Sequence, residues 1–284
     1  MTERSRSTTI RFDNQVAVVT GAGRGLGAAY AHLLANRGAR VVVHDAGVAK
    51  DGSGFDPSVA DGVARQIVDA GGSAVACHEN LEEAIGCKRV IEFTMDTFGR
   101  LDVLIHNAGL VIFAPLEETT PQVWNRMVNL GVHAPFHLLQ SAIPHMIRQA
   151  YGRVVLTTSG RALRVADNVP GLTGYAVGKM AQLGLMVGIA AETRDAGIRI
   201  NAISPVAATR ILRRHAPELK PELVAPGVIF LASPACDASG VVLSAAGGRF
   251  SGDQWSRAAG VDFGPEPIAP EMIAARWYDI VQQG

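Results

Sequence analysis

The sequence of 284 residues contains little cysteine and has no excess of charge of either sign. Its three cysteines, Cys77, Cys87 and Cys236, form an odd set without CxxC spacing, so neither a disulfide framework nor a zinc site is indicated. Basic and acidic residues number 26 each, which gives a formal net charge of zero. No overall electrostatic field would therefore hold the chain on nucleic acid or on an acidic membrane.

Segments that would direct the chain to a membrane are also missing. No run of 18 apolar residues occurs, and residues 1–12 contain three arginines but no apolar stretch of the kind that a secretory signal needs. We expect a soluble, cytoplasmic protein that acts on a small molecule, without nucleic-acid, membrane or metal-ion partners. Residues 1–12 are expected to be a flexible N-terminus.

Short β-branched runs alternate with longer helical patterns along the rest of the chain. The expected strands cover residues 16–20, 40–45, 73–77, 101–106, 153–158, 198–203 and 241–243. The expected helices cover residues 25–37, 59–70, 83–98, a long segment from about 121, 174–196 and 221–232. This alternation predicts a single α/β domain over residues 1–284, a Rossmann-type doubly wound fold whose seven-stranded, mainly parallel sheet has helices on both faces. Residues 247–284 are expected to be a C-terminal extension that packs near the substrate site or a subunit interface.

A glycine-rich turn, residues 20–27, follows the first expected strand and opens the first helix. Gly21, Gly25 and Gly27 suit a tight turn, close approach of the backbone to a pyrophosphate, and close packing of helix on strand. The amides at the helix N-terminus would bind the anion. No Gly-Lys-Ser/Thr follows, which argues against a phosphotransferase P-loop. We predict a dinucleotide site here that includes Arg24 and Leu26.

Asp45 ends the second expected strand, at the distance from the glycine turn where a carboxylate accepts the ribose hydroxyls of an adenosine. The same carboxylate would repel a 2′-phosphate. Arg24 could offset part of that repulsion, but no basic residue follows Asp45 until Lys50. The sequence therefore favours NAD over NADP as the cofactor.

This fingerprint, Asn107-Ala108-Gly109 after the fourth strand and the Tyr-Ala-Val-Gly-Lys run at 175–179 together resemble the short-chain dehydrogenase/reductase family. The resemblance implies an NAD(P)-dependent oxidoreductase acting on CH–OH groups, assembled as a homodimer or homotetramer. It implies a catalytic tetrad of Asn129, Ser159, Tyr175 and Lys179. The cofactor contacts that it implies beyond the glycine turn and Asp45 are Asn80, Leu81, Asn107, Ala108, Gly109, Tyr175, Lys179, Pro205, Val206 and Thr209.

A narrower resemblance runs nearly end to end, to the (3R)-hydroxyacyl-CoA dehydrogenase domain of peroxisomal multifunctional enzymes. Residues 43–47, 98–102, 219–227 and 270–277 carry it. It implies a (3R)-hydroxyacyl-CoA/3-ketoacyl thioester as substrate. Two alternatives stay open: a steroid or other hydrophobic cyclic alcohol, for which residues 111–113 would line an apolar pocket, and a non-catalytic dinucleotide-sensing protein.

Tyr175 and Lys179 are one helical turn apart, so their side chains can share one face of a helix. A cation about 6 Å from the phenol, at an effective dielectric of ~20, would lower the phenol pKa by roughly two units. Tyr175 would then act as general base in alcohol oxidation and as general acid in ketone reduction. Ser159 would donate a hydrogen bond to the developing oxyanion. Thr158 is the alternative, because the gap between Ser159 and Tyr175 is longer than in most of the family.

The resemblance assigns Asn129 to a water that relays protons toward Lys179; a solvated polar residue is the alternative. Pro135 predicts a kink near Asn129, because proline cannot donate to the carbonyl of residue 131. His133 and His137 have metal-ligand spacing, but no third ligand accompanies them, and we do not predict a metal site.

Two surface features remain. Basic residues gather at Arg210, Arg213, Arg214, His215 and Lys220, while Arg161 and Arg164 lie near Ser159; they are either a solvated surface or partners for a CoA phosphate. The helix over residues 174–196 has an apolar surface wider than one core-facing stripe, and it predicts a subunit interface. The apolar residues that suggest it are Met180, Leu183, Leu185, Met186 and Ile189.

Overall fold

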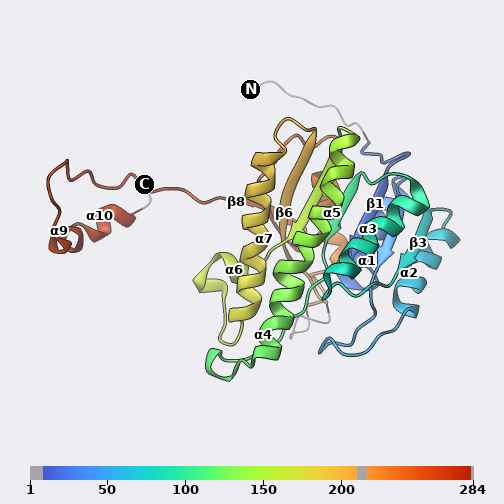
Figure 1. The fold of residues 1–284 in the computed structure, drawn as a ribbon, viewed down its shortest axis with the longest axis horizontal. Helices are drawn as coiled ribbons and strands as arrows, with labels where there is room; N and C mark the ends of the chain where they lie inside the picture. The colour runs from blue at the N-terminus through green and yellow to red at the C-terminus, as the bar shows by residue number, and fades with distance from the viewer. Residues whose placement is uncertain (1–8, 210–215, 283–284) are drawn as a thin grey trace. The chain divides into compact units, whose positions relative to one another are not determined.

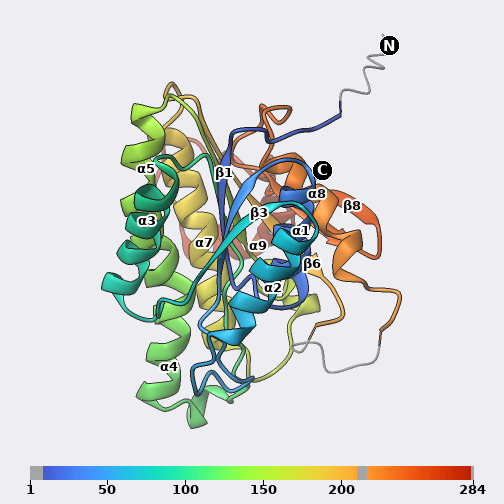
Figure 2. The same ribbon diagram turned by 90° about the vertical axis from the view of Figure 1, so that its right-hand side faces the viewer.

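The computed structural model describes residues 9–209 and 216–282, which fall into two compact units divided between Gly252 and Asp253. Across the described residues one sheet of eight strands has the order β3-β2-β1-β4-β5-β6-β7-β8 (Figures 1 and 2). The neighbours from β3 to β7 pair in parallel. The strands are β1 (Val16–Thr20), β2 (Arg40–His44), β3 (Ser73–Cys77), β4 (Val103–His106), β5 (Gly152–Thr157), β6 (Ile198–Val206), β7 (Val242–Ala246) and β8 (Arg249–Asp253).

Helices cover both faces of this sheet, as predicted. Figure 2 shows α3, α5 and α7 on one face, with α1, α2 and α8 on the other. The bounds are α1 (Gly25–Asn36), α2 (Ser58–Asp69), α3 (Ala84–Phe98), α4 (Pro121–Val128), α5 (Ala134–Arg148), α6 (Gly160–Leu163), α7 (Thr173–Glu192) and α8 (Ala225–Leu231). Short 3-10 turns are η1 (Leu116–Glu118), η3 (Val165–Asp167) and η4 (Pro221–Leu223). The second unit contains α9 (Pro270–Ala275) and α10 (Trp277–Val281).

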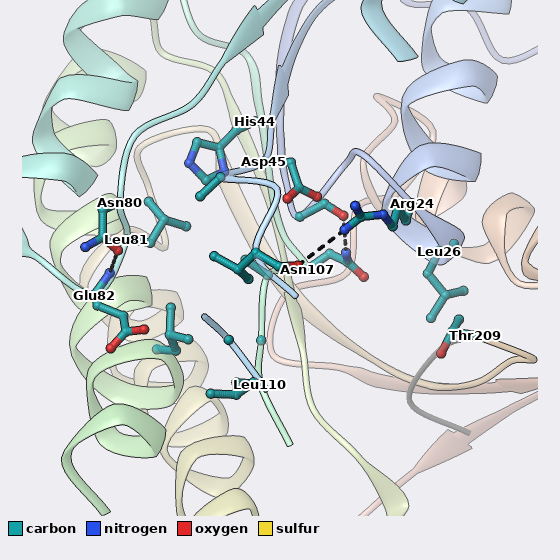
Figure 3. A pocket seen from close by; sticks show the side chains of 18 of the residues that line it. Arg24, Leu26, His44, Asp45, Asn80, Leu81, Glu82, Asn107, Leu110 and Thr209 are labelled. Atoms are coloured by element: carbon teal, nitrogen blue, oxygen red, sulfur yellow. Dashed lines mark hydrogen bonds between the residues drawn. The ribbon is translucent and has the colours of Figure 1, made fainter. Parts of the chain in front are cut away.

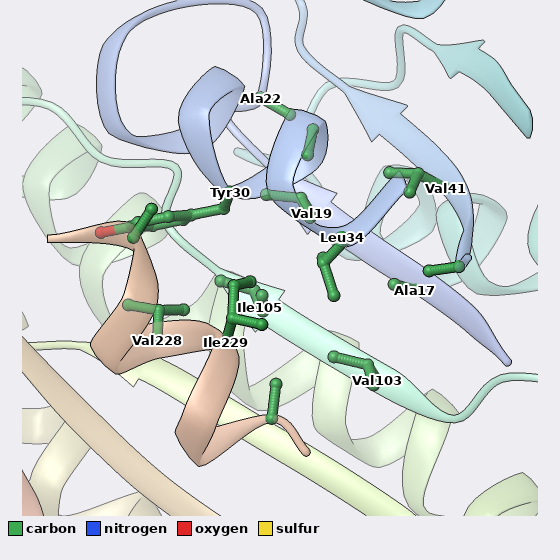
Figure 4. Packing of buried hydrophobic residues seen from close by; sticks show 14 of the residues in the cluster. Ala17, Val19, Ala22, Tyr30, Leu34, Val41, Val103, Ile105, Val228 and Ile229 are labelled. Carbon is green, nitrogen blue, oxygen red and sulfur yellow. The ribbon is translucent and has the colours of Figure 1, made fainter. Parts of the chain in front are cut away.

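Alternate residues of the central strands serve two cores. Val19 of β1 belongs to the core beneath α1, α2 and α8, where Tyr30, Leu34 and Val228 pack (Figure 4). Val18 belongs to the core beneath α3, α5 and α7. Because the side chains of a strand point alternately to its two faces, an entirely apolar strand is what a sheet covered on both faces needs.

The expected long helix from residue 121 is interrupted where Pro135 predicts. A π-helical turn, η2 (Asn129–His133), separates α4 from α5, and Pro135 is the second residue of α5. Proline has no N–H for the carbonyl four residues earlier, so the backbone must leave the regular α-helical pattern. The predicted break near Asn129 is confirmed.

The prediction of seven strands is one short, because β8 was missed. Gly247 and Gly248 join β7 to β8 with φ of +54° and +83°, the left-handed values that a two-residue hairpin turn of type I′ requires. The residues of β8 are mostly exposed and polar, so the strand lacks the apolar run by which the others were recognised. The Gly-Gly pair was the available signal.

The two ends of the chain differ from expectation in one respect. Phe12 is buried in the core and its N–H donates to the carbonyl of Arg37 at 2.8 Å, so a flexible N-terminus does not extend to residue 12. The packing of the C-terminal extension stays a prediction. Among the helices of the described ranges, none is long and apolar enough to span a bilayer.

Candidate active site

Two adjoining cavities lie at the carboxyl ends of the strands. The first, about 480 Å³, is lined by the glycine turn and by residues that follow β2, β3 and β4. The second, about 920 Å³, is lined by residues that follow β5 and β6 and by the start of α7. Four residues line both cavities: Leu26, Asn107, Gly109 and Thr209. A long ligand could therefore lie across them.

The glycine turn is shaped by close backbone approach. Gly21 has φ of +64°, and a Cβ there would lie 2.8 Å from the Cα of Ala108. A Cβ on Gly27 would collide with the carbonyl oxygen of Gly21, so this glycine brings α1 against the turn. Gly21 and Gly25 line the first cavity, together with Arg24 and Leu26, as the dinucleotide prediction requires.

Asp45 faces the first cavity with its carboxylate fixed by backbone amides. Its Oδ2 accepts from the N–H of Gly23 at 2.9 Å, and its Oδ1 accepts from the N–H of Gly47 at 2.8 Å. The residue is only 9% exposed. Each carboxylate oxygen has a further lone pair, so this side chain can still accept hydrogen bonds from a ligand.

The other wall of the first cavity contains Asn80 and Leu81, two of the cofactor contacts that the family resemblance implies. Figure 3 shows both with Glu82 on one side of the cavity, and Arg24, Leu26 and Thr209 on the other. His44 also lines this cavity; its Nε2 lies 2.8 Å from the carbonyl oxygen of Glu79. Burial lowers the pKa of His44, so the ring is neutral and its Nε2–H donates to that carbonyl.

Arg126 of α4 holds the long loop after β2 at the wall of the first cavity by hydrogen bonds. The guanidinium donates to the carbonyl oxygens of Asp51 at 3.1 Å and Gly52 at 2.7 Å. Its Nη2 also donates to Oε1 of Glu82 at 2.8 Å. Gly52, Glu82 and Arg126 all line the first cavity. We call this set of contacts the Arg126 clamp.

The Asn-Ala-Gly segment after β4 is held to the glycine turn by Thr20 and by its own amide. Asn107 Nδ2 donates to the carbonyl of Gly21 at 3.0 Å. The backbone N–H groups of Asn107 and Ala108 both donate to Oγ1 of Thr20 at 3.1 Å. These bonds fix the segment that contributes Asn107 and Gly109 to the lining of both cavities.

Lys179 is buried beneath the second cavity, one helical turn from Tyr175 on α7. Its Nζ donates to the carbonyl of Thr157 at 2.9 Å and lies 5.8 Å from the centre of the Tyr175 ring. Burial lowers the pKa of Lys179 to about 8. The neighbouring His106 is also buried, and its pKa falls to about 3 because of burial and the charge of Lys179.

The structure brings Ser159, and not Thr158, to the phenol of Tyr175. The Ser159 hydroxyl acts to lower the pKa of the Tyr175 phenol, and both residues line the second cavity. Ser159 is also the N-cap of α6, where its Oγ accepts from the N–H of Arg161 at 3.3 Å. Thr158 is buried and donates to the carbonyl of Lys179 at 2.9 Å. A hydroxyl, a phenol and an ammonium thus meet at one wall of the second cavity.

Known proteins are similar in sequence to this chain over most of its length. The family model for short chain dehydrogenases matches residues 15–218. The chain belongs to the short-chain dehydrogenase family. It is 36% identical over 279 residues to the peroxisomal multifunctional enzyme type 2 of Drosophila melanogaster, a match that covers 95% of this chain and 46% of that enzyme. The chain therefore spans less than half the length of that relative.

Solved structures confirm the fold of this short-chain dehydrogenase. A short chain dehydrogenase from Mycobacterium avium has a TM-score of 0.82 at 32% identity, with 95% of each chain covered. A 7α-hydroxysteroid dehydrogenase, solved with NADH and 7-oxo glycochenodeoxycholic acid, has a TM-score of 0.74 at 29% identity and covers 84% of this chain and 95% of its own.

One electrostatic expectation for this short-chain dehydrogenase is wrong in this structure. Lys179 was expected to lower the pKa of Tyr175, yet the pKa of Tyr175 is raised. Burial is the largest cause, because it penalises the phenolate; the Ser159 hydroxyl and the charge of Arg161 act to lower the pKa. The phenol is therefore the resting form of Tyr175, which suits a proton donor in ketone reduction.

Asn129 and the residues after β6 are placed as follows. Asn129 begins η2, and this turn packs on α7, where Gly131 and Gly178 meet so closely that a Cβ on either would crowd the other's Cα. The proton relay through Asn129 stays a prediction. Pro205 and Val206 line the second cavity and not the first, whereas Thr209 lines both.

The predicted basic cluster after β6 lies mostly in a segment that the structure does not describe. Arg210, Arg213, Arg214 and His215 of the basic cluster lie outside the described residues, and Lys220 is exposed. Within residues 9–209 and 216–282 no group of three or more His, Cys, Asp or Glu side chains could hold a metal ion. No pattern in the sequence predicts His44, Glu82 or Arg126 in the cavity wall, because their approach depends on three separate segments of the chain meeting.

Proposed function

We propose that this short-chain dehydrogenase interconverts a secondary alcohol and a ketone, with Tyr175 as the general acid and base. The observation that carries the proposal is that Tyr175, Ser159 and Lys179 meet at one wall of the second cavity. This cavity adjoins the first one, which the glycine turn and Asp45 line. In reduction, the Tyr175 phenol gives its proton to the carbonyl oxygen, while the Ser159 hydroxyl donates a hydrogen bond to that oxygen. In oxidation the Tyr175 phenolate accepts the hydroxyl proton, and the Ser159 hydroxyl again donates a hydrogen bond to the substrate oxygen.

NAD is the cofactor that we propose for the first cavity. Gly21 and Gly25 line this cavity beside the N-terminus of α1, where a pyrophosphate could approach the backbone amides, and the Asp45 carboxylate can accept from ribose hydroxyls while repelling a 2′-phosphate. A bound nicotinamide would supply or accept the hydride. Ser159 and Tyr175 line the adjoining cavity, so the substrate carbon would sit where the two cavities meet.

For the substrate we propose a (3R)-hydroxyacyl thioester and its 3-oxo form. Similarity to the Drosophila multifunctional enzyme over 95% of this chain supports it, and so do the cationic residues of the second cavity. A hydrophobic cyclic alcohol, such as a steroid, is the second candidate. It is favoured by the apolar wall of Val111, Phe113 and Leu172 and by the likeness to the hydroxysteroid dehydrogenase.

The test is a paired absorbance assay of purified protein. Acetoacetyl-CoA and cyclohexanone are each offered with NADH and with NADPH, and loss of the reduced nicotinamide is followed. We expect NADH oxidation that depends on acetoacetyl-CoA and exceeds the rate with NADPH. Turnover of cyclohexanone alone would reject the thioester and keep the alcohol–ketone chemistry. Preference for NADPH would contradict the role given to Asp45.

A further inference from the structure

Positive charge is in excess around the second cavity. Its lining includes Arg161, Arg164, Lys179 and Arg249, whereas Asp167 is the one carboxylate among the lining residues that the structure describes. Asp167 accepts from Nε of Arg164 at 2.6 Å, so it offsets the charge of Arg164. A cavity with this balance of charge favours a ligand that brings acceptor oxygens.

Arg161 of this cavity has a guanidinium nitrogen without a protein partner among the described residues. Its Nη1 is buried and has no hydrogen-bond partner anywhere in the described structure. Buried donors are nearly always paired, because leaving one unpaired forfeits the hydrogen bonds that water would have given it. Arg161 lines the cavity while its Nη1 is shielded from solvent, so a turn of the guanidinium toward the cavity would let this nitrogen donate to a ligand oxygen.

The position of Arg161 relates it to the reacting groups. It follows Ser159 by two residues in α6, and its backbone N–H donates to the Ser159 Oγ. Its positive charge also acts on Tyr175, from which the carbonyl oxygen of the substrate would take its proton. Arg161 lines the same cavity as Ser159 and Tyr175, so a substrate held by those two residues would lie in the cavity that the Arg161 side chain lines.

We propose that Arg161 selects substrates that carry a second oxygen, on the carbon two positions from the reacting one. Its guanidinium donates to the C1 oxygen of a 3-oxo compound, and so separates 3-oxo acyl groups from simple ketones. This inference rests on the proposed function and deepens it. A thioester carbonyl and a free carboxylate both present this acceptor, the carboxylate with a full charge.

The experiment compares acetoacetyl-CoA, acetoacetate and 2-pentanone as substrates with NADH. The last two differ mainly in replacing a carboxylate by an ethyl end. In wild-type protein we expect kcat/KM to be higher for at least one 3-oxo substrate than for 2-pentanone. In Arg161→Met this preference should fall roughly 10- to 100-fold, the range for a hydrogen bond to a charged donor, with 2-pentanone turnover kept.

Two further variants control for indirect effects. Lys88→Met removes a cation on the surface of α3 that lines neither cavity, so the substrate preference should stay within about threefold of wild type. Arg161→Lys keeps the charge but not the guanidinium fork, and should lose about fivefold of the preference; it replaces Arg161→Met if that variant does not fold. Affinity for NADH and the thermal midpoint are measured for each variant to confirm a native fold.

The outcomes separate this inference from the proposed function. Equal losses with 3-oxo substrates and 2-pentanone in the Arg161 variants, or no preference in wild type, would overturn the role of Arg161 and leave the alcohol–ketone chemistry standing. A wild-type preference for acetoacetate over acetoacetyl-CoA that Arg161→Met abolishes would keep the role of Arg161 and reject the thioester. A wild-type protein that turns over none of the three would contradict both.

Discussion

Lys179 lies in the interior with 6% of its surface exposed, and its ammonium has one hydrogen bond, to the carbonyl of Thr157. Burial lowers its pKa from 10.5 to about 8. At neutral pH the folded protein therefore holds a charge that would be better solvated in the unfolded chain. Removal of this charge has a predictable sign, because a buried ammonium with a lowered pKa opposes folding wherever it is protonated.

We predict that Lys179→Met gains stability relative to wild type at pH 7, and that this advantage shrinks as the pH rises. The unfolded lysine binds more protons than the folded one between pH 8 and 10.5, so the wild type recovers up to about 3 kcal/mol across that window. Urea unfolding of both proteins at pH 7 and pH 10.5 measures it. A stability difference that does not change with pH would contradict the burial of a charged Lys179.

The sequence predicted which residues form the site better than it predicted their electrostatics. Spacing along the chain placed the glycine turn, Asp45 and the pair of Tyr175 and Lys179, because each motif is local to one turn or helix. The predicted direction of the shift in the pKa of Tyr175 was wrong, since the shift depends on how deeply the folded chain buries the phenol. Residue type and spacing carry no measure of that depth.

At the scale of elements, the loop between β2 and α2 connects the two sides of the dinucleotide cavity. Gly47 and Gly52 in this loop have φ of +69° and +81°, and Arg126 holds its carbonyls against Glu82. The sequence predicts a connection between the expected strand 40–45 and the expected helix 59–70, but it offers no sign of the clamp, because Arg126 lies 75 positions after Asp51. Contacts of that kind come from the topology of the sheet.

We predict that Arg126→Met weakens NADH binding by about three- to tenfold, because the loop loses the hydrogen bonds that hold it at the cavity wall. Fluorescence titration of NADH measures the dissociation constant. Lys88→Met is the matched control, since Lys88 pairs with Glu92 on the surface of α3, away from both cavities. Equal affinities in wild type and Arg126→Met would show that the clamp plays no part in holding the cofactor.

For the whole molecule, α7 presents an apolar surface on the side away from its core. Leu183 and Met186, which were counted toward that surface from the sequence, are buried in the core of this protein. The exposed apolar residues of α7 include Val177, Met180 and Val187. They lie at helical spacing on one face, and the space beside Gly184 and Gly188 is open enough for another helix to approach.

We predict a homodimer or homotetramer in which this face of α7 packs against a second copy. Val187, 59% exposed, would be buried there, so Val187→Asp should shift the protein toward monomer by burying an unpaired charge. Val68→Asp on α2 is the control, because Val68 is exposed to a similar degree, at 51%, and should leave the mass unchanged. Light scattering at micromolar concentration gives the mass. A monomeric wild type would reject this interface.

The most direct test of the central claim, that Tyr175 transfers the proton in a dinucleotide-dependent ketone reduction, is the effect of Tyr175→Phe on binding and on turnover. We predict that NADH affinity stays within a few-fold of wild type while kcat falls at least about 100-fold, the contribution of a general acid. Turnover within tenfold of wild type would contradict the claim. A wild type that binds NADH and turns over no ketone would instead indicate a dinucleotide sensor.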